Sequence, residues 1–387
     1  MKTKKALSLL LALVLALSVL IPLSALAASG GKQYKNVIFM IGDGMGENHL
    51  KLAEAYGYDL FMDEYYDCRG QSKTRSFSNA VTDSAAGATA LSCGVRNTNS
   101  CVATYWYDPS GTFFRPKNIT ENAMDHGMRT GVVTTDSTAG ATPAGYSSYA
   151  RSRNMDDVIT ERQLASGIDL IWGGAVDCVT RTDVEKLGIT YVSSKTEMEA
   201  LTPGTRSFGQ LGGSFWRPSL PEESGLPTLR EMTEKAISLL DCRAGFFLMV
   251  EGAHIDKNSH ASDEGVDYPE KRERAAAAVK AFDDAVKAAV EFAKQDGHTI
   301  VIVTADHETG DLYMENGAYH YHSGSHTGAN VPLIVFCCDD FVKDGQAVKN
   351  CDIPVILSEK LGWSKTEFPK MMPGSFLEKI RNLFRKF

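Results

Sequence analysis

The sequence has little that points to thiol chemistry or to a serine hydrolase. None of its eight cysteines are spaced as Cys-x-x-Cys, so we assign the cysteines to structure rather than to metal binding. No Gly-x-Ser-x-Gly segment is present, which argues against the nucleophile elbow of a Ser-His-Asp hydrolase. The chain also has no internal repeat and no low-complexity tract. It is therefore a globular sequence whose chemistry depends on other residues.

Positive charge is also scarce. The 40 Lys and Arg residues are outnumbered by 48 Asp and Glu residues, and the formal net charge is −8. Three lysines fall within the first five residues, ahead of a nearly unbroken apolar run at 6–23 and the small-residue segment Ala25-Leu26-Ala27. This pattern predicts a signal peptide at 1–27, in preference to a retained membrane anchor, and its removal would bring the charge to −11. Such an acidic chain excludes nucleic acid as a specific partner.

The predicted signal peptide places the protein in the periplasm or outside the cell, as a secreted protein. Disulfides form in such compartments. Cys93 and Cys101 flank a short loop and are the first candidates for a pair.

Apolar runs alternate with helical patterns over residues 28–373, which we predict to form a single domain. The alternation predicts an α/β fold, a three-layer α/β/α sandwich with a central, mostly parallel β-sheet. The segment 173–227 is richer in Gly, Pro and Ser and is expected to form a peripheral lobe or loops. The expected strands are 36–41, 130–135, 168–172, 245–250, 298–304 and 331–337. The expected helices are 84–92, 118–127, 143–150, 228–240, 270–294, 354–361 and 376–386.

The terminal segment 374–387 predicts a basic amphipathic helix. Apolar side chains, including Phe376 and Phe387, share one face, whereas Lys and Arg residues crowd the other. We expect this helix to dock on the core or on a neighbouring subunit. Contact with a membrane surface is the alternative, and the basic composition suits it.

Aspartate, glutamate and histidine residues recur where expected strands end. After the strand at 245–250 comes a glutamate, and then an aspartate and a histidine four residues apart, which share one face if the backbone turns helical. A zinc site usually takes three or four protein ligands, so other segments must complete this one. Ligands in open α/β sheets gather at the carboxyl ends of strands. The recurrence favours a metal centre over isolated caps, built from Asp43, Glu251, Asp256, His260, Asp306, His307 and His326.

Two further segments supply other polar groups. Ser84 begins an expected helix rich in small residues, where its hydroxyl would meet the exposed N–H groups, although Asp83-Ser84 alone is more often just an N-cap. Thr142 precedes a proline and is predicted as a helix N-cap. Arg153 lies about three turns on, near or past the helix end, and its guanidinium fork suits two phosphoryl oxygens. Arg151 is the competing candidate.

Taken in order, these segments resemble the alkaline phosphatases. The motifs are Asp-Gly-Met-Gly, Thr-Asp-Ser-Ala-Ala, Ala-Thr-Pro-Ala followed by Ser-Arg, Val-Glu-Gly-x-x-Ile-Asp-Lys-x-x-His, Thr-Ala-Asp-His and Ser-His-Thr-Gly. Asp-Gly-x-Gly alone is weak, but six motifs in the family's order cover about residues 35–337. The resemblance implies that 28–373 is the catalytic domain of a phosphomonoesterase. It implies a phosphoserine intermediate on Ser84 and a phosphate clamp at Arg153.

The resemblance also implies two Zn²⁺ ions and one Mg²⁺ ion as cofactors. Sites rich in nitrogen and carboxylate ligands suit Zn²⁺, whereas an all-oxygen site suits Mg²⁺. The implied ligands are Asp256, His260 and His326 for the first zinc, Asp43, Asp306, His307 and the Ser84 hydroxyl for the second, and Asp43, Thr142 and Glu251 for magnesium.

Two departures from the family pattern bear on these expectations. Gly140 stands two residues before Thr142, where relatives often carry Asp or His near the magnesium, so the metal at the third site stays open. Only eighteen residues separate His307 from His326, an interval that in larger relatives holds a crown-like subdomain at the dimer interface. A homodimer is compatible with the sequence, and the oligomeric state stays open. The alternative functions are a phosphodiesterase of the same superfamily and a non-catalytic phosphate- or metal-binding exoprotein.

Overall fold

The computed structural model describes residues 33–106, 113–212, 225–260, 262–263, 266–364 and 368. From Tyr34 onward the chain clusters as one unit. The predicted signal peptide at 1–27 and the predicted helix at 374–387 lie outside the described residues. Within the described ranges, no helix combines the length and the apolar character needed to cross a membrane.

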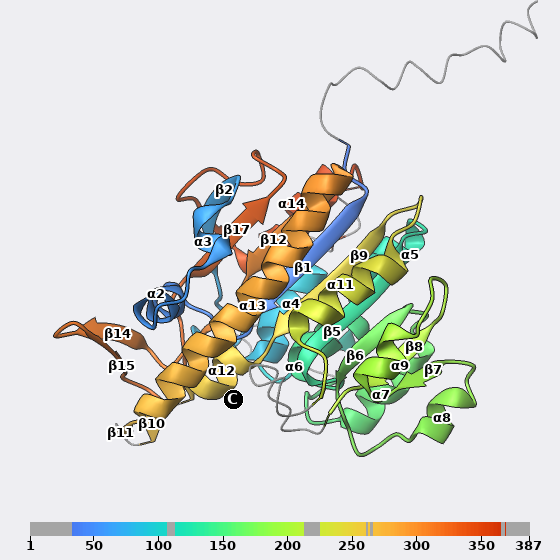
Figure 1. Ribbon diagram of the computed structural model, residues 1–387, viewed down its shortest axis with the longest axis horizontal. Helices are drawn as coiled ribbons and strands as arrows, with labels where there is room; N and C mark the ends of the chain where they lie inside the picture. The colour runs from blue at the N-terminus through green and yellow to red at the C-terminus, as the bar shows by residue number, and fades with distance from the viewer. Residues whose placement is uncertain are drawn as a thin grey trace, which may run out of the picture. The chain divides into compact units, whose positions relative to one another are not determined.

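A ten-stranded sheet forms the centre of this unit (Figure 1). Its strand order is β18-β2-β17-β12-β1-β9-β5-β6-β8-β7, and only the pairs β12–β17 and β17–β2 are antiparallel. The strands are β1 Asn36–Gly42, β2 Cys68–Lys73, β5 Arg129–Ser137, β6 Leu170–Gly174, β7 Thr190–Val192, β8 Ser207–Gln210, β9 Phe246–Gly252, β12 Thr299–Thr304, β17 Val331–Phe336 and β18 Ala347–Lys349. All six predicted strands are confirmed, and the two strands β7 and β8 of the segment 173–227 extend one edge of the sheet.

Buried apolar side chains cover both faces of the sheet, as the three-layer prediction requires. Along β1, Ile38 and Met40 join one hydrophobic core, whereas Val37, Phe39 and Ile41 join the other. This follows from the pleat, because successive side chains of a strand point to opposite faces. A strand buried on both faces therefore has a continuous apolar sequence.

Helices from distant parts of the chain form the outer layers. The first core contains side chains of α2, α11, α12 and α13, and the second contains side chains of α4, α5, α6, α7 and α14. In Figure 1 the long helix α13 and the helix α11 cross the sheet on the viewer's side. The helices are α2 Glu47–Ala55, α3 Phe61–Glu64, α4 Ser84–Cys93, α5 Ile119–Asp125, α6 Ala141–Ser147, α7 Asp156–Ala165, α8 Arg181–Glu185, α9 Lys195–Glu199, α11 Leu229–Leu240, α12 His254–Ser259, α13 Pro269–Asp296 and α14 Ile353–Lys360, preceded by the 3-10 turn Asn350–Asp352.

Short two-stranded pairs decorate the ends of the sheet. One hairpin, β14 with β15, extends the segment between His307 and His326 and is visible at the left of Figure 1. A second pair, β13 with β16, brings the residues just after His307 beside His326. The pairs are β3 Tyr105–Trp106 with β4 Phe113–Phe114, β10 Ser262–Asp263 with β11 Val266–Asp267, β13 Glu308–Thr309 with β16 His326–Thr327, and β14 Leu312–Glu315 with β15 Ala318–Tyr321.

Three local predictions are wrong. The helix expected at 143–150 is α6 Ala141–Ser147, and its N-cap is Gly140 rather than Thr142, which lies inside the first turn. The helix ends there because Ser148 adopts an extended conformation, so Arg153 lies past the helix end, which is one of its two expected places. Cys93 and Cys101 are both free thiols. They point to different partners, Ser92 Oγ and the Arg151 carbonyl respectively.

Candidate functional site

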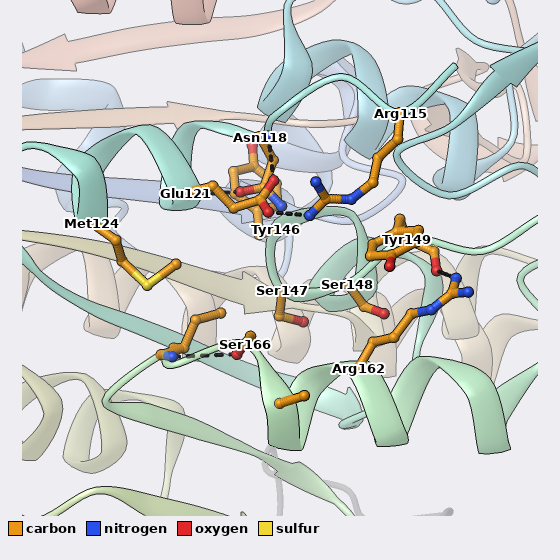
Figure 2. A pocket seen from close by; sticks show the side chains of 12 residues that line it. Arg115, Asn118, Glu121, Met124, Tyr146, Ser147, Ser148, Tyr149, Arg162 and Ser166 are labelled. Carbon is orange, nitrogen blue, oxygen red and sulfur yellow. Dashed lines mark hydrogen bonds and ion pairs between the residues drawn. The ribbon is translucent and has the colours of Figure 1, made fainter. Parts of the chain in front are cut away.

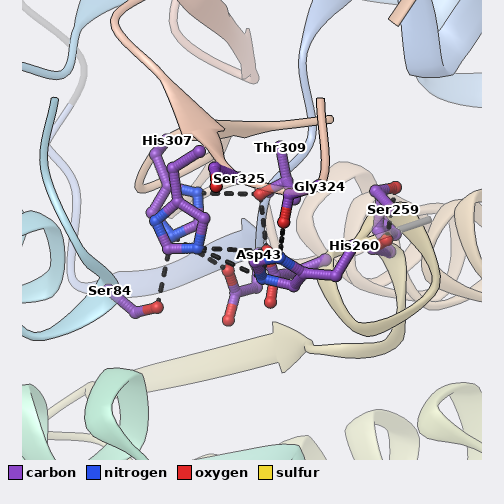
Figure 3. Close-up of polar contacts among 12 residues, drawn as sticks. Asp43, Ser84, Ser259, His260, His307, Thr309, Gly324 and Ser325 are labelled. Atoms are coloured by element: carbon purple, nitrogen blue, oxygen red, sulfur yellow. Dashed lines mark hydrogen bonds and ion pairs between the residues drawn. The ribbon is translucent and has the colours of Figure 1, made fainter. Parts of the chain in front are cut away.

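Two groups of metal-type ligands lie at the carboxyl edge of the central strands (Figure 3). β1 pairs in parallel with β9 and β12, so the residues that follow these strands leave the sheet at one edge. Ile41 lies opposite both Glu251 and Thr304 in this register. Among the described residues, the groups with ligand atoms within 4.8 Å of one another are Asp256 with His260 and His326, and Asp43 with Asp306 and His307.

The first group has the spacing of a tetrahedral zinc site. Two ligand atoms about 2.0–2.1 Å from a tetrahedral Zn²⁺ lie about 3.3 Å apart. His260 Nε2 lies 3.3 Å from His326 Nε2, and these nitrogens lie 3.2 Å and 3.5 Å from Asp256 Oδ1. The three atoms therefore converge as the first implied zinc requires.

Backbone carbonyls orient the two imidazoles of this group. His260 Nδ1 lies 2.7 Å from the Gly324 carbonyl, and His326 Nδ1 lies 3.1 Å from the Thr82 carbonyl. A carbonyl can only accept, so each Nδ1 carries the proton and each Nε2 keeps its lone pair. This arrangement, with a fixed tautomer, is typical of metal-binding histidines.

The second group brings three further ligand atoms together around His307 Nε2. This nitrogen lies 3.5 Å from Asp43 Oδ1, 3.3 Å from Asp306 Oδ2 and 3.2 Å from Ser84 Oγ. Asp43 Oδ1 and Asp306 Oδ2 are buried and have no hydrogen-bond partner. Buried carboxylate oxygens are rarely left unpaired, and a divalent cation would satisfy both.

Thr309 joins the two groups and was not predicted from the sequence. Its Oγ1 lies 2.5 Å from Asp256 Oδ1 and 3.2 Å from His307 Nδ1 (Figure 3). The hydroxyl donates to the carboxylate and accepts from the imidazole, so His307 Nε2 is left unprotonated. The one sequence signal was its position two residues after the Asp306-His307 pair.

Ser84 is the first residue of α4, at the place where the second ligand group meets the helix. Asp83 caps this helix, because its carboxylate accepts from the Ala86 N–H at 3.0 Å. Gly87 lets the helix approach the ligands, since a Cβ there would lie 2.9 Å from Asp306 Cβ. The small residues that follow Ser84 therefore allow this end of the helix to pack closely against Asp306.

The Arg153 side chain points to Ser84. Arg153 Nη1 lies 3.5 Å from Ser84 Oγ and 3.6 Å from Asp83 Oδ2. The loop that carries Arg153 is fixed to the same region, because its backbone N–H donates to the Ser100 carbonyl at 2.7 Å. A guanidinium beside the hydroxyl suits an anion bound at that oxygen.

The residues implied for the third site are buried oxygens. Thr142 Oγ1 and Glu251 Oε1 have no hydrogen-bond partner, and both side chains are essentially inaccessible to solvent. Glu251 is also among the charges that raise the pKa of Asp43, after burial and the charges of Asp306 and Asp256. Oxygen donors of this kind suit a hard cation such as Mg²⁺.

Burial and mutual repulsion raise the pKa of several carboxyl groups here. The pKa of Asp43 is raised well above its ordinary value, first by burial and then by the charge of Asp306. Burial, followed by the charge of Asp256, raises the pKa of Asp306 to about 6. Burial, followed by the charge of Asp136, raises the pKa of Glu251 to about 8. Crowded carboxylates of this kind are stabilised in their charged form by a bound cation.

Two of the three imidazoles shift in the direction that metal binding needs. Burial lowers the pKa of His307 and of His326 to about 4, so both rings are neutral at neutral pH. The hydrogen bond with Asp256 raises the pKa of His260. Burial would raise the pKa of Asp256, but the hydrogen bond from His260 and the charges of the histidines lower it. His307 and His326 are therefore neutral imidazoles beside carboxylates, as zinc sites use, whereas His260 must release its Nε2 proton when a cation binds.

A pocket of about 280 Å³ lies apart from these ligands, between α5, α6 and α7 (Figure 2). None of the predicted site residues line it. Its two arginines are already paired, because Arg115 forms an ion pair with Glu121 and Arg162 donates to the Tyr149 carbonyl. This pocket has no feature of a phosphoryl-transfer site.

Comparisons with known proteins agree with the geometry. A family model described as alkaline phosphatase matches residues 34–333. The chain is 32% identical to alkaline phosphatase 4 of Bacillus subtilis (strain 168) over 329 residues, which cover 76% of this chain and 67% of that relative. It spans less than two-thirds of the length of several further relatives that it matches.

Solved structures share the fold. The alkaline phosphatase from the Antarctic bacterium TAB5 superposes with a TM-score of 0.74 at 29% identity, covering 86% of this chain and 100% of that chain. A mutant of the TAB5 protein, with Mg bound in a site called M3, gives a TM-score of 0.71 at 27% identity and covers 86% and 99%.

Proposed function

The chain belongs to the alkaline phosphatase family, and from this premise we propose that it is a metal-dependent phosphomonoesterase that acts on phosphate monoesters. The observation that carries the proposal is the place of Ser84. Its Oγ lies 3.2 Å from His307 Nε2 and 3.5 Å from Arg153 Nη1, at the start of α4. A hydroxyl beside a ligand group and a guanidinium is positioned for attack on a bound phosphoryl group.

Ser84 is the proposed nucleophile. It takes the phosphoryl group from the substrate as the alcohol leaves, carries it as phosphoserine, and returns to a hydroxyl when water releases phosphate. Arg153 is the proposed phosphate clamp, because its fork can donate to two non-bridging oxygens where charge develops during transfer. Asp83 supports both, since its carboxylate caps α4 and lies 3.6 Å from Arg153 Nη1.

We propose two Zn²⁺ ions and one Mg²⁺ ion as cofactors. The spacing of the ligand atoms supports zinc at the first two sites, and the buried oxygens of Thr142 and Glu251 support magnesium at the third. The relative with Mg bound in its M3 site supports a third cation position in this family. Bound cations of this kind stabilise the attacking and leaving oxygens of an in-line displacement.

A monoester substrate suits this site better than a diester. A phosphate monoester carries a second negative charge, and Arg153 together with a third cation supplies positive charge to match it. We expect the zinc-loaded protein with added Mg²⁺ to hydrolyse an aryl phosphate monoester faster than the matching diester. A faster diester would favour the phosphodiesterase.

Ser84→Ala and chelation complete the test. We expect both to abolish hydrolysis, and we expect re-addition of Zn²⁺ and Mg²⁺ to restore the chelated wild-type protein but not the variant. A variant that keeps the full rate would end the nucleophile proposal. Phosphate binding without any turnover by the wild-type protein would favour a non-catalytic exoprotein.

Export, assembly and membrane contact are further proposals. We propose secretion on the strength of the basic start, the apolar run and Ala25-Leu26-Ala27. Sequencing the amino terminus of the exported protein should find the chain beginning at Ala28. A homodimer stays a prediction, to be tested by light scattering. Membrane contact by 374–387 also stays a prediction, to be tested by comparing the vesicle binding of the full chain with that of a chain lacking these residues.

A further inference from the structure

The side chain of Asp136 fills the space next to Gly140, beside the third site. Gly140 caps α6, two residues before Thr142. A Cβ built at Gly140 would lie 2.8 Å from Asp136 Cγ and 3.0 Å from the Ser137 carbonyl oxygen. The Asp136 carboxylate therefore stands where a side chain at position 140 would begin, and it would have to move aside for any residue larger than glycine there.

A bend at the end of β5 puts Asp136 in this place. The register between β5 and β6 shifts between Val133 and Ser137, which is the signature of a β-bulge. Bulges commonly re-aim a side chain next to an active site. The turn closes tightly, because the Gly140 N–H donates to the Ser137 carbonyl at 2.9 Å.

Asp136 is hydrogen-bonded to Thr134, which in turn contacts Glu251. Its backbone N–H donates to Thr134 Oγ1 at 2.8 Å, and the same hydroxyl is hydrogen-bonded to Glu251 Oε2. Thr134 also lies opposite Glu251 in the β5–β9 pairing. The other oxygen of the same carboxylate, Glu251 Oε1, is buried and has no hydrogen-bond partner.

Asp136 also holds a cation of the protein itself. Its Oδ1 forms an ion pair with Lys257 Nζ, and Lys257 follows the zinc-type ligand Asp256 on α12. The side chain of Asp136 is 19% exposed and that of Lys257 is 39% exposed, so the pair is partly open to solvent, unlike the buried oxygens of Thr142 and Glu251. Such a carboxylate can accept hydrogen bonds from the waters that Mg²⁺ retains.

We propose that Asp136 is a positioning residue of the third cation site, which takes from β5 the place that Gly140 leaves open and holds Lys257 beside that site. The inference rests on the proposed function, because it assigns Asp136 to the site formed by Thr142 and Glu251. The acidic partner that Gly140 cannot supply is thus present in this chain, four residues earlier. It adds carboxylate oxygens beside the site, which favours a hard divalent cation such as Mg²⁺.

The test is calorimetric titration of Mg²⁺ into zinc-loaded protein, with zinc content measured on the same samples. Asp136→Asn keeps the shape and removes the charge. We expect it to weaken Mg²⁺ binding about 10- to 100-fold, the usual effect of removing a partner of a metal site, and to leave the zinc content unchanged. Asp156→Asn is the control, because Asp156 is exposed yet close enough for the charge of Asp136 to raise its pKa after burial.

Two further variants separate position from charge. Gly140→Ala should weaken Mg²⁺ binding as well, because its Cβ displaces the Asp136 carboxylate. The double variant Asp136→Gly with Gly140→Asp returns a carboxylate from the other side of the turn and should recover part of the affinity.

The proposal is overturned if Asp136→Asn binds Mg²⁺ within about twofold of the wild type, or if Asp156→Asn loses as much affinity. It is also overturned if the zinc-loaded wild type binds no Mg²⁺. In these cases a wild-type protein that still hydrolyses a monoester with zinc alone leaves the proposed phosphatase function standing. Loss of hydrolysis in Ser84→Ala tests the proposed nucleophile and does not bear on the role of Asp136.

Discussion

Thr309→Val tests whether the two ligand groups depend on the hydroxyl between them. Thr309 Oγ1 donates to Asp256 Oδ1 at 2.5 Å and accepts from His307 Nδ1 at 3.2 Å. Valine has a similar shape, so the packing changes little while both hydrogen bonds are lost. His307 is fully buried, so its Nδ1–H would then lack an acceptor.

Two independent magnitudes bear on the size of the effect. Removing the partner of a metal ligand usually costs about 10- to 100-fold in metal affinity, which is about 1.4 to 2.8 kcal/mol at about 1.4 kcal/mol for each tenfold. Leaving a buried donor unsatisfied costs about 1–3 kcal/mol. The two ranges agree. We therefore expect Thr309→Val to bind zinc about 10- to 100-fold more weakly, at both sites, because Thr309 contacts one ligand of each.

Competition with a chromophoric chelator measures this directly. Thr233→Val is the matched control, because Thr233 is also buried and its hydroxyl donates only to the Leu229 carbonyl at 2.7 Å, within α11. The control should keep the wild-type zinc affinity. A Thr309→Val protein that holds both zinc ions as tightly as the wild type would refute the proposed role of the hydroxyl.

Two further predictions concern Arg153 and His49. Arg153→Ala should lower kcat/KM for a monoester about 10- to 100-fold, because a hydrogen bond to a charged group contributes about 1.5–3 kcal/mol, whereas Arg151→Ala should stay near the wild type. Equal losses in steady-state assays of both variants would argue against the clamp. Burial lowers the pKa of His49 to about 4, so its folded form resists protonation while the unfolded form takes up a proton near its ordinary value of 6.5. Stability from this group is thus present above pH 6.5 and lost as the pH falls towards 4, by about 3 kcal/mol. Denaturant unfolding of metal-free wild type and His49→Gln at both ends of this range should show a loss that is larger by this amount in the wild type, because His307 and His326 titrate in both proteins.

Much of the fold could be predicted because the central strands are buried on both faces. β1, β9 and β12 are continuous apolar runs, and such runs are recognised without any alternation. β2 was missed because its sequence, Cys68–Lys73, alternates polar with small residues. The helix α7 was missed because it is mostly polar. The shift of α6 had a local cause that composition does not reveal, since Gly140 ends the preceding turn and begins the helix.

The members of the two groups could be predicted because aspartates and histidines are readable at strand ends, whereas the contacts that support them could not. The carbonyls of Thr82 and Gly324 orient two imidazoles, yet a carbonyl belongs to every residue and carries no sequence signal. Nothing in the sequence distinguishes Thr309 from other threonines, and only the fold of β13 places it between Asp256 and His307. Asp136 depends on a bulge that the apolar pattern of β5 does not show.

The measurement that tests the central claim most directly is identification of the phosphorylated residue. The zinc-loaded protein would be mixed with a phosphate monoester, quenched in acid and digested for mass spectrometry. The account predicts one added phosphoryl group on the peptide that contains Ser84, and none in Ser84→Ala, which should also be inactive. A phosphoryl group on another residue, or full turnover by Ser84→Ala, would contradict it.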